Sequence, residues 1–370
     1  MPSDGVSLTQ QLIRIPSISG DQGQQEVLGL IADRLGDADF VVHRDVFVPQ
    51  RFLLVTTRTA DAGAALLFLC HADTVPLGDP AAWARDPFSG DVSDGRVWGR
   101  GASDMKSGLA AAVVALLSAG PYGPPAALLL TTDEEVGCLG ARAAAEALAR
   151  LDVGAMVVPE STNNRVVLGH RGALWLNLLA TGVAAHGSTP QLGSNALLAM
   201  ARTLVDIAER LPLGPGEAIL GPTTINVATM ASGTAPNIVP ERAVATLDIR
   251  FAGADEPAAI LSWLAQRHPA LEVCTALQVG RLLGTADSPW IGSLPADLAQ
   301  PPSADYFTDA AVLAELFPAA PVAVWGPGQA ELAHRRDESV SVEQVDAAVE
   351  LFAATLRAWP LVTPQMKESS

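Results

Sequence analysis

The sequence predicts an α/β fold that is interrupted by a smaller α+β domain. Over the first 170 residues, short apolar runs alternate with longer helical stretches, which is typical of helices on both faces of a largely parallel sheet. Residues 171–283 follow a β-α-β-β-α-β order, the split βαβ pattern of a ferredoxin-like module. The α/β pattern then returns. We therefore expect one α/β domain made of residues 1–170 and 284–370, with residues 171–283 inserted.

The elements of the outer domain follow from the spacing of its apolar residues. Helices are expected at residues 6–15, 22–35, 106–118, 139–150, 304–316 and 342–359, and strands at 40–47, 52–58, 64–69, 126–131, 155–158 and 322–325. The runs at 64–69 and 126–131 are apolar enough to be strands buried inside the sheet.

The inserted domain has longer strands and two helices. Strands are expected at residues 173–181, 223–231, 243–251 and 271–280, and helices at 194–210 and 257–266. These six elements give the split βαβ order over about 110 residues.

Length and charge exclude several classes of protein. The chain has 370 residues, of which 49% are hydrophobic, so it is long enough for two domains and is not wholly disordered. Its 23 basic and 40 acidic residues give a net charge of −17, which argues against nucleic acid and anionic membranes as partners.

The cellular location is predicted from the apolar runs, the N-terminus and the cysteines. No apolar run reaches the roughly 18 residues of a membrane span, and the N-terminus lacks the basic start and apolar stretch of a signal peptide. The three cysteines are far apart and form no CxxC pair, which argues against a disulfide framework. We expect a soluble cytoplasmic protein.

A histidine and an aspartate follow the first buried strand. His71 and Asp73 come directly after residues 64–69, and ligand sites in open α/β sheets lie at the carboxyl ends of strands. Asp73 is placed to orient the ring of His71, as a metal-bound imidazole usually requires. Taken alone, the pair fits an ordinary loop histidine better.

A glycine-rich segment at residues 99–108 contains Asp104. It is similar to a phosphate-binding loop, but GxGxxG requires glycine where Asp104 stands, and the Gly-Lys-Ser/Thr order of a P-loop is absent. A carboxylate at this position repels phosphate and suits a metal ion.

More carboxylates and a second histidine stand at further strand ends. They are Asp133, Glu134 and Glu135 after residues 126–131, Glu160 after 155–158, and His334 downstream of 322–325. An acidic run is usually a solvated loop. When adjacent carboxylates point in different directions, however, one can bind metal while the other stays free as a base. Two histidines and three carboxylates suit a pair of zinc-like ions with one bridging carboxylate.

Two other hydrolase classes lack their motifs. A single-zinc HExxH helix is absent, and no GxSxG elbow occurs, because Ser93 and Ser103 each lack one of the required glycines.

Taken together, these segments resemble the dinuclear-zinc amidohydrolases of the acetylornithine deacetylase, succinyl-diaminopimelate desuccinylase, aminoacylase-1 and glutamate carboxypeptidase type. The resemblance covers nearly the whole chain, on His71-Ala72-Asp73-Thr74-Val75-Pro76, residues 99–108, Asp133-Glu134-Glu135-Val136-Gly137, Glu160-Ser161-Thr162, and residues 233–240 and 333–338. It implies a zinc-peptidase-like catalytic domain and identifies residues 171–283 as a lid that also mediates dimerisation.

The resemblance implies a role for each residue of the strand-end cluster. His71, Asp104 and Glu160 would hold one Zn²⁺, and Asp104, Glu135 and His334 the other, with Asp104 bridging and the peptide Asp104–Met105 cis. Asp73 would sit behind His71. Glu134 would be the general acid/base beside a bridging hydroxide that acts as nucleophile. Co²⁺ or Mn²⁺ would be possible substitutes, since carboxylate-rich sites accept several divalent ions.

The inserted domain would contribute His186 and Asn237. In the family, the matching histidine reaches the partner subunit's active site and stabilises the oxyanion, and we carry this role to His186. A surface histidine is the alternative if the protein is a monomer. Arg250 is a candidate clamp for a substrate carboxylate, with a structural ion pair to Asp248 as an equal alternative.

Two segments depart from the family pattern. The family often has a Gly-Gly-Thr-Ser/Thr-Asp loop that touches the substrate carboxylate, and here Thr308 and Asp309 remain while Tyr306 and Phe307 replace the glycines. After His334, the sequence has Arg335-Arg336 where Thr/Gln-Pro is common. These changes bear on specificity.

We interpret the sequence as a dinuclear-zinc hydrolase that removes the acyl group from an N-acylated amino acid, of the deacetylase or desuccinylase type. The alternative on the same scaffold is a dipeptidase or glutamate-carboxypeptidase-like enzyme acting on short peptides, because function depends on side pockets. A non-catalytic binder is disfavoured by the intact Glu134, and a nucleotide-dependent enzyme by the failed phosphate motif.

Overall fold

The computed structural model describes residues 2–44, 51–284 and 286–367. The chain divides into two compact units. Unit 1 is Met1–Gly169, Leu283–Ser303 and Thr308–Ser370, and unit 2 is His170–Leu282 with Ala304–Phe307. The insertion expected at 171–283 lies one residue from the observed break at each end, but the sequence did not predict the return of Ala304–Phe307 to unit 2. The chain passes between the two units at four points. Three of these points lie inside short strands, namely β8 (Gly169–His170), β13 (Leu282–Leu283) and β14 (Ser303–Ala304).

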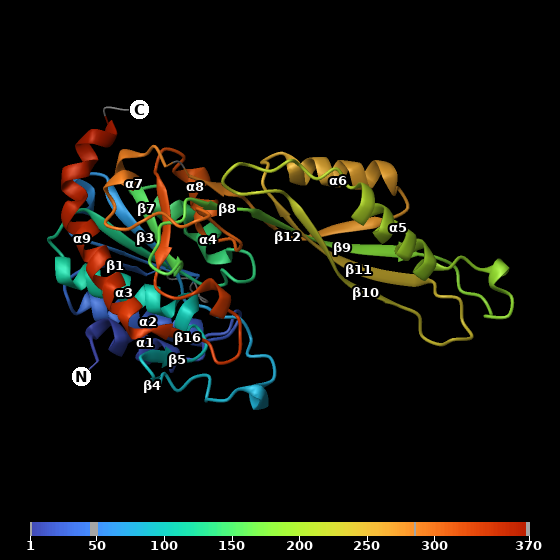
Figure 1. Ribbon diagram of the computed structural model, residues 1–370, viewed down its shortest axis with the longest axis horizontal. Helices are drawn as coiled ribbons and strands as arrows, with labels where there is room; N and C mark the ends of the chain where they lie inside the picture. Colours follow the sequence, from blue (N-terminus) through green and yellow to red (C-terminus); the bar gives the residue numbers. More distant parts are fainter. Residues whose placement is uncertain (1, 45–50, 285, 368–370) are drawn as a thin grey trace. The chain divides into compact units, whose positions relative to one another are not determined.

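Unit 1 is built on a six-stranded mixed sheet (Figure 1). Its order is β1 (Val41–Arg44), β2 (Phe52–Thr56), β6 (Ala126–Thr131), β3 (Ala65–His71), β7 (Val153–Ser161) and β15 (Val322–Gly326). The last four run parallel, whereas β1 and β2 are antiparallel to their neighbours. The mostly parallel sheet is therefore confirmed. Of the strand expected at 40–47, residues 45–47 lie outside the described residues.

Helices cover both faces of this sheet, as expected. Leu53 and Val55 of β2 pack into a core with one group of helices, whereas Leu54 faces a groove lined by α4. Successive side chains of a strand point to opposite faces, so α4 lies on the face opposite that core. The first group is α1 (Asp4–Ile13), α2 (Gly23–Gly36), α3 (Ser107–Ala119), α7 (Pro289–Ser293) and α9 (Val342–Lys367); α4 (Leu139–Leu148) packs with α8 (Ala310–Leu316).

Three features of unit 1 differ from the expectation. The helix expected at 304–316 begins only at Ala310, because the residues before it include β14 and the segment of unit 2. A small sheet of β4 (Val92–Ser93), β5 (Arg96–Trp98) and β16 (Ser339–Ser341) was not predicted, because strands of two or three residues are too short to show an alternation of apolar and polar residues. A π-helical turn, Ala102–Lys106, precedes α3 and was not expected, whereas the Asp104–Met105 peptide bond inside it is cis, as the family resemblance implies.

One described segment is long and apolar enough to cross a membrane by length and composition, Ala102–Ala119, with a mean hydropathy of 1.2. It is 72% buried inside the protein, and α3, which forms most of it, contributes to the core of unit 1. A helix at the centre of a core has the same apolar composition.

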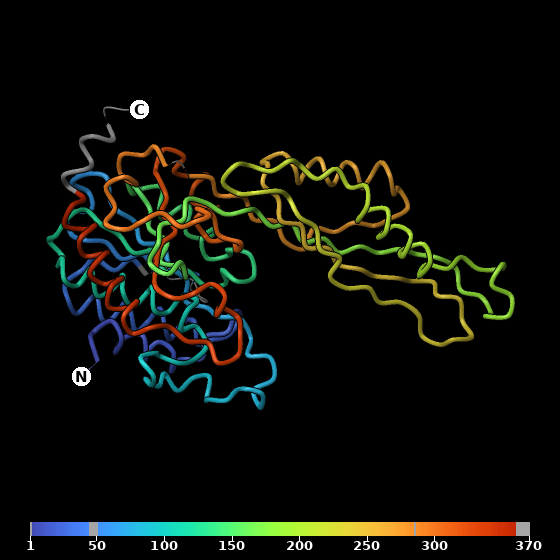
Figure 2. Tube along the Cα trace, in the orientation of Figure 1, coloured from blue at the N-terminus to red at the C-terminus, as the bar shows by residue number. Residues whose placement is uncertain are grey.

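Unit 2 is an antiparallel sheet with two helices on one face (Figure 2). Its strands have the order β10 (Thr224–Ser232), β11 (Arg242–Phe251), β9 (Gly172–Thr181) and β12 (Glu272–Val279). Alternate residues of β9 and β11 are buried against α5 (Ala196–Arg210) and α6 (Glu256–Arg267). The chain order β-α-β-β-α-β and this strand order are those of a ferredoxin-like module.

Candidate metal centre

The sheet of unit 1 brings the predicted ligands to one edge. His71 is the last residue of β3, Glu160 lies near the end of β7, and Glu135 follows β6 by four residues. Asp104 stands in the turn before α3, and His334 follows β15 on a loop. Because β3, β6, β7 and β15 run parallel, their carboxyl ends meet on the same side of the sheet, where ligand sites of open α/β folds lie.

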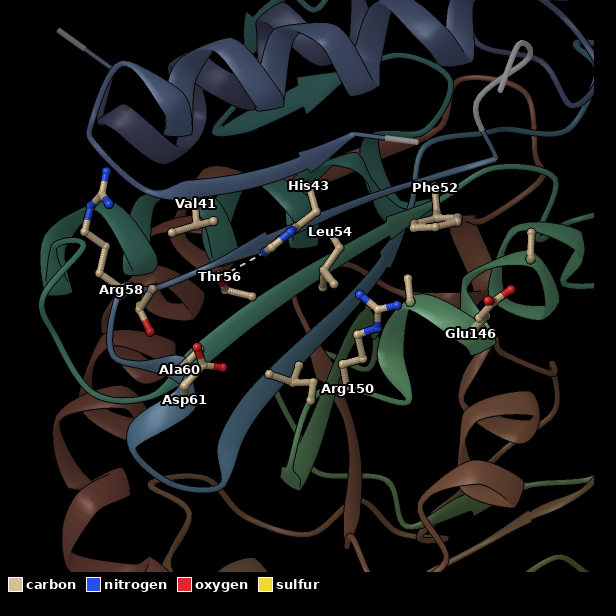
Figure 3. Close-up of a pocket in the computed structure, with 14 residues that line it drawn as sticks. Val41, His43, Phe52, Leu54, Thr56, Arg58, Ala60, Asp61, Glu146 and Arg150 are labelled. Carbon is tan, nitrogen blue, oxygen red and sulfur yellow. Dashed lines mark hydrogen bonds between the residues drawn. The ribbon is translucent and has the colours of Figure 1, made fainter. Parts of the chain in front are cut away.

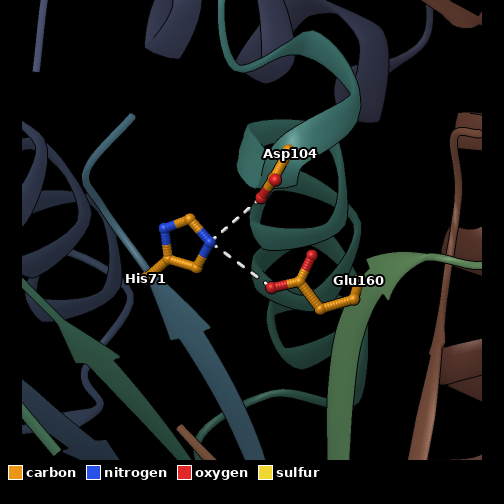
Figure 4. A group of neighbouring side chains, drawn as sticks. All are labelled: His71, Asp104 and Glu160. Carbon is orange, nitrogen blue, oxygen red and sulfur yellow. Dashed lines mark hydrogen bonds and ion pairs between the residues drawn. The ribbon is translucent and has the colours of Figure 1, made fainter. Parts of the chain in front are cut away.

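The first group of ligand atoms is His71, Asp104 and Glu160 (Figure 4). Nε2 of His71 lies 3.1 Å from Oδ1 of Asp104 and 3.3 Å from Oε1 of Glu160. Nδ1 of the same ring lies 3.0 Å from the backbone carbonyl of Asp73 and 3.6 Å from its carboxylate. Asp73 therefore stands behind His71, and it is its main-chain oxygen that makes the closer contact.

The second group is Asp104, Glu135 and His334. Nε2 of His334 lies 3.1 Å from Oδ2 of Asp104 and 3.1 Å from Oε1 of Glu135. His334 has a left-handed φ of 60°, a backbone region that non-glycine residues populate sparsely and that is found preferentially at functional sites. Asp104 thus offers one carboxylate oxygen to each group.

The donor set fits two divalent ions. Nitrogen and oxygen ligands about 2.0–2.1 Å from a tetrahedral ion are separated by about 3.3 Å, close to the 3.1–3.3 Å found here. The two groups share one carboxylate and contain no thiol, which is a ligand set for zinc-like or harder divalent ions.

Electrostatics favour positive charge at this place. Burial raises the pKa of Glu160 to about 7, and the Asp104 carboxylate adds to this effect. Asp104 and Glu135 raise the pKa of His334 to about 10. Burial lowers the pKa of His71, but the three surrounding carboxylates outweigh it and raise that pKa well above its usual range. The cluster therefore retains protons that divalent cations can replace.

The three adjacent carboxylates have three different surroundings. Asp133 is turned away from the ligands and accepts hydrogen bonds from Gly20, Gln24 and Arg51. Glu135 belongs to the second ligand group, and Glu134 belongs to neither of the two groups that share Asp104. Burial raises the pKa of the Glu134 carboxyl well above its usual range, and the neighbouring carboxylates raise it further.

Asp73 also holds the loop that carries Glu134. Its two carboxylate oxygens accept the backbone N–H groups of Glu134 and Glu135 at 3.1 and 3.2 Å. The hydroxyl of Ser19 donates to the same carboxylate at 2.8 Å. Sequence reasoning placed Asp73 behind His71 but did not anticipate that it fixes the next strand's loop, because residues 73 and 134 are related only through the pairing of β3 with β6.

Glu338 is a buried residue whose role sequence reasoning missed. Its Oε1 accepts the N–H groups of Ser103 and Asp104 at 2.8 and 3.0 Å, and its Oε2 pairs with Arg100 at 2.7 Å. The available signal was its place in the motif at residues 333–338. It fixes the turn that presents Asp104.

Cys138 and Asp309 lie beside Glu134. Ligand atoms of the three residues all lie within 4.8 Å of one another, and all three side chains are buried. The hydroxyl of Thr131 donates to Oδ2 of Asp309. Asp309, which the sequence retains from the family's substrate-contacting loop, is 3% exposed.

The remaining predicted residues are divided between the units. Thr308 is in unit 1, buried, with its hydroxyl oxygen 3.3 Å from the N–H of Ala310, which donates to it. His186 and Asn237 are exposed in unit 2, on neighbouring loops joined by a bond from the Gly187 N–H to the Asn237 carbonyl. Nδ1 of His186 accepts from the Ser188 N–H at 3.1 Å.

Arg250, also in unit 2, already has an ionic partner. Its Nε and a terminal nitrogen lie 2.9 and 3.2 Å from the two carboxylate oxygens of Asp248. Its guanidinium lies 5.7 Å from the ring centre of Phe307. The structural ion pair, one of the two alternatives for this residue, is therefore present, and a clamp role would require Arg250 to exchange or share this partner.

A separate groove of about 500 Å³ lies on unit 1 between β1, β2 and α4 (Figure 3). Its lining includes His43, Leu54 and Arg150. None of the predicted site residues lines it.

The model of peptidase family M20/M25/M40 matches residues 67–358. A succinyl-diaminopimelate desuccinylase of Cereibacter sphaeroides is 34% identical over 292 residues, which cover 76% of each chain.

Solved structures share the fold. An M20 family metallo-carboxypeptidase, Sso-CP2, from Sulfolobus solfataricus superposes with a TM-score of 0.78 at 16% identity, covering 97% of this chain and 100% of that one. The YXEP protein of Bacillus subtilis, described as a dinuclear metal binding peptidase, has a TM-score of 0.68 at 13% identity, covering 98% and 97%. At these identities the likeness concerns the fold.

Proposed function

This chain belongs to peptidase family M20/M25/M40, and on that premise we propose that it hydrolyses the amide bond of an N-acylated amino acid with two divalent metal ions. Relatives that are about a third identical over three quarters of the chain are named succinyl-diaminopimelate desuccinylases. An N-succinyl or N-acetyl amino acid is therefore the first substrate class to test.

One observation carries the proposal. Two groups of three ligands share Asp104, and Glu134 stands next to ligand Glu135 without belonging to either group. A carboxylate that stays free beside two metal-binding groups is what a metal-assisted hydrolase needs for proton transfer. A protein that only bound an N-acyl amino acid would not require it.

We assign His71, Asp104 and Glu160 to one ion and Asp104, Glu135 and His334 to the other. The chemistry that such ions supply is Lewis acidity, which polarises the scissile carbonyl and acidifies water. Zinc fits the nitrogen and oxygen ligands, and Co²⁺ or Mn²⁺ fit the same set.

Glu134 would take the proton from the attacking water and return it to the leaving amine. An amine leaves poorly as an amide anion, so this return of the proton is part of the barrier. Burial of Glu134 favours the proton-bound state that the second step needs. Asp73, which holds the backbone of Glu134 and contacts His71, would keep the base in register with the metal ligands.

The peptidase alternative has less support. The solved peptidases that share the fold are below 20% identical to this chain, so their substrates do not transfer. Dipeptides are nevertheless the right competing substrates, because the same ligands and base serve both reactions.

We further propose that unit 2 is a lid that forms a homodimer, with His186 completing the partner subunit's active site. The exposed loop position of His186 supports this role, as does its free Nε2, since Nδ1 accepts from Ser188. Asn237, on the adjoining loop, would contact the same substrate. Arg250 and Thr308 remain candidates for binding the substrate carboxylate.

A cytoplasmic location remains a prediction. All three cysteines are free, which suits a reducing compartment. The net charge of −17 supports the absence of nucleic acid and anionic membrane among its partners.

The deciding experiment is amine release by the metal-loaded protein, with a chelated control. The substrates are N-succinyl-diaminopimelate, N-acetylornithine, other N-acetyl amino acids and several dipeptides. We expect chelator-sensitive release from one acylated amino acid. Release from dipeptides alone would move the protein to the peptidase class, and release that survives chelation would contradict the metal mechanism.

A further inference from the structure

A third group of potential metal ligands lies beside the two that share Asp104. It consists of Glu134, Cys138 and Asp309, all in unit 1, with ligand atoms within 4.8 Å of one another. The exposed fractions of these residues are 5%, 0% and 3%. The group shares no residue with the first two, so its occupation would not displace an ion from them.

Two buried oxygens in this group lack a hydrogen-bond donor in the described part of the chain. They are Oε1 of Glu134 and Oδ1 of Asp309. Folded proteins seldom leave buried acceptors without a donor, a water or an ion, because the desolvation cost is then not offset. The second oxygen of Asp309 is engaged by Thr131, so the first is held in a fixed direction. These unpaired oxygens indicate a place for a cation.

Cys138 gives this place a chemical preference. Its left-handed φ of 58° at the start of α4 turns the chain back beside Glu134, and its N–H donates to the Glu134 carbonyl at 3.0 Å. Its sulfur lies within 4.8 Å of a carboxylate oxygen of Asp309. Thiolates select zinc-like ions over magnesium or calcium, so a site with one sulfur and two carboxylates differs from the two all-nitrogen-and-oxygen groups.

We propose that Glu134, Cys138 and Asp309 form a third, inhibitory cation site for a thiophilic divalent ion such as Zn²⁺. When the ion binds, the S–H bond of Cys138 breaks, the proton passes to solvent, and the sulfur donates the electron pair it keeps. No electron is transferred and no co-reactant is needed. Burial keeps the pKa of this thiol well above its usual range, so the thiol stays protonated until an ion replaces the proton.

The inhibition follows from the shared carboxylate. An ion held by Glu134 occupies the oxygen that would accept the proton from water, and its charge disfavours protonation of that carboxylate. This half of the inference rests on the proposed function of Glu134 as the general base. The binding half does not, because it depends only on the three ligands.

The test uses Co²⁺ as the probe, since a cobalt–thiolate bond absorbs in the near ultraviolet and cobalt with nitrogen and oxygen ligands does not. The exposed Cys274 is first removed by Cys274→Ser to exclude binding at the surface. The metal-free protein is then titrated with Co²⁺ while absorption and amide hydrolysis are followed together. We expect no thiolate band during the first two equivalents, and a band with the third, accompanied by a loss of activity of about tenfold or more.

Two variants identify the thiol. Cys138→Ser keeps a hydroxyl beside Asp309 but has no thiolate, so the band should be absent and half-inhibition should need about tenfold more Co²⁺. Cys70→Ser is the matched control, because Cys70 is the other buried thiol, and it should keep the band. A band that persists in Cys138→Ser, or a third equivalent that brings no band, would overturn the site.

Ion binding at the third group and the inhibition through Glu134 can be refuted separately. A band that develops with the third equivalent while activity stays constant would uphold the site and refute both the inhibition and the role of Glu134 as base. If Cys138→Ser does not fold, Asp309→Asn replaces it, since an amide oxygen still accepts from Thr131 but carries no charge. That variant should bind the third ion about tenfold more weakly and the first two as before; unchanged binding of the third ion would contradict the proposal.

Discussion

Glu338 accepts a hydrogen bond from the backbone N–H of Asp104 at 3.0 Å, although 234 residues separate the two in the sequence. The contact joins the loop that carries His334 to the turn that presents Asp104. The carboxylate of Glu338 is almost fully buried and is balanced by Arg100. The shape of the metal centre thus depends on an ion pair that does not itself belong to the ligand groups.

Replacing Glu338 by Ala should destabilise the protein and weaken metal binding together. The change leaves Arg100 buried without its anion, which costs about 3–5 kcal/mol, and leaves the Ser103 and Asp104 amides without an acceptor. Urea unfolding and bound-metal analysis after dialysis measure the two effects. Glu331→Ala, at an exposed position of the same loop, is the control. Full metal content in the Glu338 variant would contradict the positioning role.

Glu134→Gln should abolish turnover while leaving metal content nearly unchanged. The amide keeps the volume of the side chain but cannot accept the proton of water, so kcat should fall about 10²–10⁴-fold. Because Glu134 is in neither of the two groups that share Asp104, two metal ions should still bind. Glu146→Gln, at an exposed position on α4, should have parental kcat. Normal turnover in Glu134→Gln would refute the base assignment.

The sequence was sufficient to predict which side chains gather in the two groups that share Asp104, but not the residues that support them. His71, Glu160 and the Glu134–Glu135 pair could be found because each follows an apolar run that reads as a buried strand, and parallel strands present their ends together. The supports of these residues come from elsewhere in the chain. Asp73 holds the amides of Glu134 and Glu135, and Glu338 holds that of Asp104, through contacts that no local pattern records.

The boundaries of Ala304–Phe307 were missed for a similar reason. Residues 304–316 read as one helix from composition, yet the first four belong to unit 2 and the helix starts at Ala310. Intrinsic helix propensity predicts helix boundaries only weakly, because tertiary packing overrides it. The sequence likewise showed no sign that Asp309 lies buried beside Glu134 and Cys138.

Asp309 should make the metal-free protein less stable as the pH rises from about 4 to 6. Burial raises the pKa of its carboxyl from 3.8 to about 6. Between these values the unfolded chain has lost the proton and the folded protein has kept it, so stability falls with rising pH, by about 3 kcal/mol in all. Below pH 3.8 both states are protonated and the effect vanishes.

Asp309→Asn should remove this dependence, since an amide does not titrate. Urea unfolding of the chelated protein at pH 4 and pH 7 measures the free energy of unfolding. Relative to the parent, the variant should be more stable at pH 7 than at pH 4. Asp61→Asn, at an exposed position, should follow the parent at both pH values. A constant difference between Asp309→Asn and the parent would show that Asp309 does not titrate in this range.

Chelation should lower the melting temperature. Without cations, the carboxylates of Asp104, Glu135 and Glu160 repel one another in a buried space. Metal at a hundred times its dissociation constant adds about 2.7 kcal/mol, which corresponds to about 5–10 °C for a unit of this size. Differential scanning calorimetry with and without chelator measures the shift. His334→Ala, which lacks a ligand of the second group, should show a smaller shift, and an equal one would argue against His334 as a ligand.

Two inactive variants should restore activity when mixed, if His186 acts across a dimer. One variant is Glu134→Gln with His186 intact, and the other is His186→Ala with Glu134 intact. In a mixed dimer, one site combines an intact Glu134 with the partner subunit's His186 and is complete. Random exchange makes half of the dimers mixed, with one complete site in each, so about a quarter of the parental activity should return. The assay is the amidase rate after the variants are unfolded and refolded together, with separately refolded proteins as the control. Because His186 lies on an exposed loop of unit 2, its replacement should leave metal content unchanged. If activity fails to return although the mixed species is present by mass spectrometry, then His186 serves its own subunit's site, or none.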